Sequence, residues 1–130
     1  MFQVVSSPDV KRLILDLNKF NQLFEGLDAD GRELDGIGGS YSFTTIRKKL
    51  SKGLPIDRVT LFDEGDFYDT FRLDVSDVGF IISADTFKEG VDLQDRWGFD
   101  LVGLTDESFE QLQDEIKQRL ILWLLDFLLD

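Results

Sequence analysis

Residues 120–129 constrain this chain more than any other part of its sequence. Nine of these ten residues are apolar, and Asp126 is the exception. They continue a helical stripe of apolar residues at spacings of three and four that runs from Phe109 to Phe127. A helix that is apolar on all sides is stable only when protein or lipid surrounds it. A single domain of 130 residues can hardly wrap a terminal helix, so the sequence predicts a partner for this segment.

Helix-end signals predict two flanking helices and a short one between them. Ser7 as cap and Pro8 in the first turn favour a helix over about residues 8–25. Thr105 caps the last helix, and the acidic residues that follow it suit the positive end of the helix dipole. A short helix is predicted over residues 44–52, capped by Thr44 or Thr45.

The middle of the chain predicts strands. Residues 58–62 form a β-type run, and residues 72–75 alternate apolar and polar side chains before a turn at 76–79. Residues 79–84 then return as a second strand, which together predicts an antiparallel hairpin. The predicted fold is α+β, one domain over 1–130. An N-terminal helix and a long C-terminal helix pack on a small antiparallel sheet, with residues 27–57 inserted as a mobile, extended loop or arm that carries the short helix.

The segment 87–104 leaves two interpretations open. It is rich in apolar residues and includes Trp97. A segment of this kind lies either across the sheet or against another subunit. Trp97 is therefore a candidate interface residue.

Charge and composition exclude several classes of function. The chain has 26 acidic and 14 basic residues, a formal net charge of −12. A general nucleic-acid binder needs a basic surface, so this class is disfavoured. The chain has no cysteine and no histidine, which excludes disulfides, thiol nucleophiles, Cys/His zinc sites and a histidine general base. Its first residues show no signal-peptide pattern, and no run reaches the ~20 apolar residues of a transmembrane helix.

The basic residues are clustered. Five of the 14 fall within positions 47–58, most of them on the predicted short helix. Such a helix is either a solvated face or a contact element for an acidic surface, such as that of a second copy of the chain. The candidate contact residues are Arg47, Lys48, Lys49 and Lys52.

No catalytic, cofactor or metal site is predicted. The Asp/Gly-rich stretch after Gly26 fails the EF-hand pattern, because placing Gly31 sixth in the loop puts Gly26 first and Ile37 twelfth, where oxygen ligands are required. The densest acidic group, within 63–69, resembles solvated surface and lacks a phosphate-binding loop. A metal-dependent enzyme is the alternative that this group leaves open.

Two short stretches resemble a known family. Residues 59–71, VTLFDEGDFYDTF, are similar to the "T-G-x-hydrophobic-x-x-S" motif of phage tail-completion and neck proteins, with Gly65, Phe67 and Thr70 at motif positions. The sequence departs from the motif at Glu64, where the family prefers Thr, and at Thr70, where it prefers Ser. Residues 102–107, VGLTDE, are similar to the lead-in to the last helix of related virion-morphogenesis proteins, through Gly103, Leu104 and Thr105.

This resemblance implies a non-enzymatic structural subunit. Copies would form a head–tail connector or tail-completion ring in the virion, assembled in the host cytoplasm beside other virion proteins. DNA would be passing cargo, repelled by acidic walls. The expected contact residues on the last helix are Trp123, Leu124 and Phe127. The alternative is a peripheral membrane-associated or partner-binding acidic module that uses the same helix.

Overall fold

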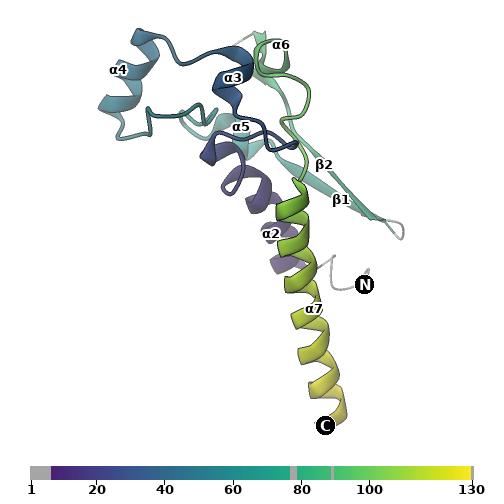
Figure 1. Ribbon diagram of the computed structural model, residues 1–130. Coiled ribbons are helices and arrows are strands. Elements are labelled where there is room, and N and C mark those ends of the chain that lie inside the picture. Colours follow the sequence, from purple (N-terminus) through teal and green to yellow (C-terminus); the bar gives the residue numbers. More distant parts are fainter. Residues whose placement is uncertain (1–6, 77–78, 89, 130) are drawn as a thin grey trace.

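The computed structural model describes residues 7–76, 79–88 and 90–129. They form six α-helices and two small antiparallel sheets of two strands each. Figure 1 shows the long C-terminal helix α7 running beside the shorter N-terminal helix α2 and continuing beyond it. The predicted α+β class with a long C-terminal helix is confirmed.

Helix α2 spans Pro8–Lys19, and the Ser7 hydroxyl accepts a hydrogen bond from the Val10 amide at its start. The helix is shorter than predicted because the chain turns at Phe20 into the short 3₁₀ helix η1, Leu23–Glu25. Gly26 ends this turn at a φ of 83°, a backbone conformation that glycine adopts without strain. Helix α7 spans Asp106–Leu129, and the Thr105 hydroxyl caps it by accepting from the Ser108 amide.

The predicted hairpin is present. Strands β1, Arg72–Ser76, and β2, Gly79–Ser83, pair antiparallel with Leu73 opposite Ile82 and Val75 opposite Phe80. The predicted turn falls partly on residues 77–78, which lie outside the described residues. The side chains of the two strand pairs, Leu73 with Ile82 and Val75 with Phe80, pack against a buried cluster that α2 and α7 share. This cluster, here called the helical core, consists of Val10, Ile14, Leu17, Leu112 and Ile116.

A second buried cluster, here called the aromatic core, lies around helix α5, Asp66–Asp69. Its members are Leu23, Leu34, Val59, Leu61, Phe67, Tyr68, Phe71, Trp97 and Leu101. The Tyr68 hydroxyl donates to the Thr60 carbonyl at 2.6 Å. Burial raises the pKa of Tyr68 above its ordinary value.

Residues 58–62 are not a strand, in contrast to the prediction. Side chains take the place of a strand partner: the Tyr41 hydroxyl accepts from the Thr60 and Leu61 amides at 2.9 and 3.1 Å. The backbone of Leu61 has a φ of 56°, which an extended strand does not allow. The β-rich composition of this run reflects burial in the aromatic core rather than sheet pairing.

The inserted segment is folded against the rest of the chain at its start, not extended from it. Helix α3, Leu34–Gly38, packs against α6, Leu93–Trp97. The Arg96 guanidinium donates to the Gly38 and Ser40 carbonyls at 2.9 and 3.0 Å. A β-carbon on Gly38 would lie 2.6 Å from the Arg96 carbonyl and from the Trp97 ring, so this close approach requires glycine.

The short basic helix is α4, Phe43–Ser51. Ser42 caps it instead of Thr44 or Thr45: the Ser42 hydroxyl accepts from the Thr45 amide at 3.2 Å. In Figure 1, α4 lies at one edge of the molecule, away from α7.

Part of the segment 87–104 packs within its own chain, whereas its side chains Phe87, Val91 and Phe99 are exposed. It forms strands β3, Phe87–Lys88, and β4, Val91–Asp92, and then α6. Leu101 beyond α6 is completely buried. The Asn18 amide side chain joins this region to α2, because it donates to the Leu101 carbonyl and accepts from the Gly103 amide.

Candidate assembly surfaces

The second half of α7 is an exposed apolar surface, here called the α7 tail, residues 120–129. Every residue from 121 to 129 is exposed, and Trp123, Phe127 and Leu129 expose 61%, 67% and 85% of their surface. The rings of Trp123 and Phe127 stack at a centroid distance of 5.9 Å. Scattered apolar side chains are ordinary at a surface, but a continuous apolar helix end marks an interaction site.

In space, the α7 tail begins at the level of the first turn of α2. The Arg119 guanidinium lies 4.0 Å from Asp9 in the first turn of α2 and 3.4 Å from Glu115. Beyond this level, α2 offers no further turns that could cover α7 (Figure 1). Within the described residues, no helix is both long and apolar enough to cross a bilayer.

The predicted contact residues of the α7 tail are thus at the surface, whereas Trp97 is not. Trp97 is 4% exposed in the aromatic core, where Arg96 lies over its ring at 4.4 Å. Its position removes Trp97 from the candidate interface residues. The sequence could not distinguish the two cases, because a buried and an interfacial tryptophan have the same apolar neighbours along the chain.

The four predicted basic contact residues divide into three environments. Arg47 and Lys48 are exposed, and Arg47 lies over the Phe43 ring at 6.0 Å. Lys52 is paired with Asp63 at 2.6 Å and with Glu64 at 3.5 Å. This pairing lowers the pKa of Asp63 and raises that of Lys52. The pairing also neutralises part of the acidic group within residues 63–69, for which the sequence left a metal site open.

Lys49 is buried, with 3% of its surface exposed, so it is not on the outer face of α4. Its ammonium donates to the Phe62 carbonyl and to the Thr60 hydroxyl, and lies 4.7 Å from the centre of the Tyr41 ring. All three partners are neutral. In the described part of the chain no carboxylate oxygen lies within ion-pair distance of Lys49.

Lys49 lines a groove of about 410 Å³, here called the basic groove. Its cations come from three elements: α4, β3 and α6. They are Lys48, Lys49, Lys88 and Arg96, and Asp63 is the one carboxylate among the lining residues. Sequence reasoning missed Lys88 and Arg96, because they lie far along the chain in an acidic stretch and only the fold brings them to α4.

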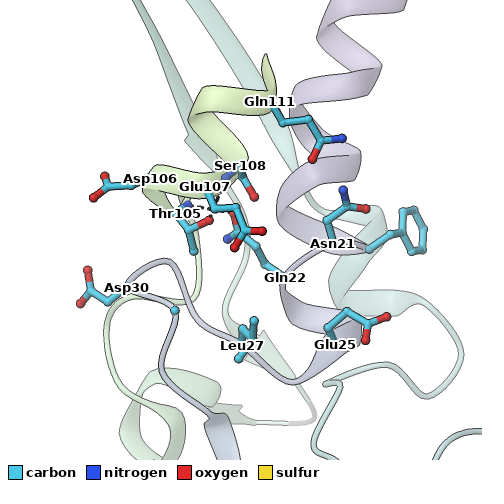
Figure 2. A pocket seen from close by; sticks show the side chains of 12 residues that line it. Asn21, Gln22, Glu25, Leu27, Asp30, Thr105, Asp106, Glu107, Ser108 and Gln111 are labelled. Atoms are coloured by element: carbon cyan, nitrogen blue, oxygen red, sulfur yellow. Dashed lines mark hydrogen bonds between the residues drawn. The ribbon is translucent and has the colours of Figure 1, made fainter. Parts of the chain in front are cut away.

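A second groove, of about 770 Å³, lies between the end of α2 and the start of α7 (Figure 2). It is polar, and its carboxylates are Glu25, Asp30, Asp106 and Glu107. The Gln22 side chain fixes the edge of the groove by donating to the Gly103 carbonyl and accepting from the Thr105 amide. This acidic groove was not predicted either.

The family-motif residues have structural contacts. Gly65 precedes α5 at a φ of 87°, and Phe67 lies in the aromatic core. The Thr70 hydroxyl donates to the Phe67 carbonyl and accepts from the Asp85 amide. Gly103 and Thr105 are held by Asn18 and Gln22, and Leu104 packs on the helical core.

The carboxylates of Asp28, Asp30 and Asp100 lie close enough together to hold a metal ion. However, the Arg32 guanidinium already lies among them, 3.2 Å from Asp28, 3.5 Å from Asp30 and 3.0 Å from Asp100. A hydrogen bond and charge repulsion from Asp100 raise the pKa of Asp30. The Arg32 guanidinium thus already supplies positive charge to this cluster.

Comparison with known proteins adds no relative. No family model matches the chain, and neither a curated protein nor a solved structure matches it.

Proposed function

We propose that this protein is a non-enzymatic structural subunit that assembles with copies of itself through the α7 tail. The observation that carries the proposal is the exposure of every residue from 121 to 129 on a helix end that is almost entirely apolar. Burying such side chains is worth about 1.5–3 kcal/mol each. Removing this surface from water is therefore a strong driving force for association.

The wider role that we propose is that of a bacteriophage head–tail connector or tail-completion subunit, with the chain in the virion next to other structural proteins. The resemblance of residues 59–71 and 102–107 to neck proteins supports it. The net charge of −12 also suits a ring through which DNA passes, because acidic walls repel phosphates and let the duplex slide. Electron microscopy of the assembled protein tests this role: a ring with acidic residues on its inner wall is expected, and acidic residues only on its outer wall would refute the DNA duct.

The assembly test compares solution masses by light scattering over a range of protein and salt concentrations. The wild-type chain should form a discrete oligomer, and the double variant Trp123→Asp/Phe127→Asp should be monomeric. Gln113→Asp/Gln118→Asp is the matched control, since it adds the same charge at exposed polar positions of the same helix. Unchanged assembly of the Trp123/Phe127 variant would refute the proposal.

A membrane surface is the second candidate for the α7 tail. Lys117 and Arg119 directly precede the apolar segment, as in interfacial helices that bind anionic lipid. Asp126 within the segment argues against it, because anionic lipid repels its carboxylate. Flotation with anionic liposomes distinguishes the two: a self-assembling subunit should stay with the soluble fraction, and a membrane-associated module should float.

A further inference from the structure

Among the described residues, the basic groove holds more positive charge than the carboxylates that line it compensate. Four cations line it, and Asp63, the one carboxylate of its described lining, is bound to Lys52 at 2.6 Å. Besides Lys52, the charges of Lys88 and Lys49 also help to lower the pKa of Asp63, so one carboxylate is shared among several cations. The buried ammonium of Lys49 has neutral hydrogen-bond partners in the described residues. A buried charge is costly unless an opposite charge compensates it. An anion from outside the chain would supply that compensation.

The first turns of α7 carry the opposite imbalance. Asp106, Glu107 and Glu110 are all exposed there, and among the described residues none of them forms an ion pair. Glu25 lies across the acidic groove from this turn (Figure 2), as does Asp30, which is paired with Arg32 at 3.5 Å. The other dense acidic groups of the described chain already contain a cation, Arg32 or Lys52. The start of α7 is therefore an exposed acidic segment without an ion-pair partner among the described residues.

We propose that the basic groove of one copy binds the acidic first turns of α7 of a second copy. The two surfaces lie at different places on the chain, one between α4 and α6 and the other at the junction of α2 and α7. A contact between unlike surfaces is heterologous, and its repetition produces a ring or a helical filament. The inference rests on the self-assembly proposed above and adds a second contact that orients neighbouring copies head to tail.

Reciprocal charge reversal tests this contact in the full chain. Variant A is Lys48→Glu/Lys88→Glu in the basic groove, and variant B is Glu107→Lys/Glu110→Lys on α7. Each alone sets like charges against each other and should weaken association about tenfold or more. A mixture of A and B restores opposite charges wherever an A copy meets a B copy, so it should associate more tightly than A or B alone. Sedimentation velocity at low salt measures all three, and raised salt should weaken the wild-type assembly as it screens these charges.

The control is Arg12→Glu/Arg72→Glu, which makes the same charge change as variant A at exposed positions away from both surfaces. Thermal unfolding of A, B and the control shows whether each is folded. Assembly of variant A like the wild type, or a mixture no better than A or B alone, would overturn the inference.

The outcomes separate this inference from the tail proposal. If A and B assemble normally while Trp123→Asp/Phe127→Asp is monomeric, the tail contact stands and the groove contact is wrong. If the wild-type chain is monomeric at every concentration, both the tail contact and the head-to-tail contact between copies are overturned, whereas a subunit that assembles only on a neighbouring virion protein is not.

Discussion

The more hydrophobic half of α7 is the exposed one, and the less hydrophobic half packs in the core. Its first half, residues 106–119, has three apolar residues, and two of them, Leu112 and Ile116, are buried in the helical core. Its second half has nine apolar residues in ten, and those from 121 onward are exposed. What differs is the neighbour: α2 covers the first half and begins at the level of Arg119. Hydrophobicity thus drives burial only where another element is within reach, and no described element covers α7 from residue 121 onward.

The largest effect on the free energy of unfolding is expected when one alanine substitution is made in each half of α7 and the two are compared. Leu112→Ala removes a side chain that is 1% exposed and should lower the free energy of unfolding by about 2–5 kcal/mol. Leu128→Ala, at a position that is 73% exposed, should lower it by less than about 0.5 kcal/mol. Urea unfolding at a concentration where the chain is monomeric measures both. Equal losses would mean that the α7 tail is packed within its own chain.

A second comparison tests how α2 holds the start of α7. Asn18→Ala leaves the Leu101 carbonyl and the Gly103 amide without their partner and should cost about 1–3 kcal/mol. Asn21→Ala, at an exposed position one turn further on, is the control and should be nearly neutral. The same urea experiment measures both variants. A neutral Asn18 variant would show that the hydrophobic contacts of the helical core alone fix the junction.

Alkaline pH should weaken the aromatic core. The unfolded chain releases the Tyr68 proton near the ordinary pKa of 10.0, whereas burial raises the pKa in the folded chain, so the folded state keeps the proton. Stability is thus fully present below pH 10 and falls as the pH rises above it. Tyr68→Phe should cost about 1 kcal/mol at neutral pH, through the lost hydrogen bond to Thr60, and should flatten this alkaline decline. Unfolding curves between pH 8 and pH 11 test it, and an unchanged slope in the variant would contradict the assignment to Tyr68.

The smallest effect is expected at acid pH from the exposed pair of Asp63 and Lys52. Because Lys52 lowers the pKa of Asp63, the pair stabilises the fold above the ordinary Asp value of 3.8 and loses this contribution as the pH falls below it. Asp63→Asn should therefore be slightly less stable than the wild type at neutral pH and equal to it in acid. Asp66→Asn, an exposed neighbour outside the pair, is the control. A stability difference that persists in strong acid would point to a cause other than this pair.

Local signals predicted much of the fold. Ser7 and Thr105 cap the helices they were expected to cap, and the alternation of residues 72–75 with 79–84 identified the hairpin. Residues 58–62 were misjudged, because their β-rich composition serves burial while Tyr41 and Lys49 satisfy their backbone. The candidate site was predicted in part: the α7 tail was recognised as a continuous run, whereas the grooves join residues that no spacing relates.

The sequence by itself excluded cysteine and histidine chemistry in this chain and identified a helix that one domain cannot bury. The first follows from the residue types present, and the second from the helical spacing of the apolar residues. The tertiary structure alone decided which side chains are available. Trp97 and Lys49 appear equivalent to Trp123 and Lys48 in the sequence, yet the first two are buried and the last two exposed. The physical reason is that burial depends on which distant segments reach a residue. Here α3 and Tyr41 reach Trp97, the 60–62 segment reaches Lys49, and no described element reaches the end of α7.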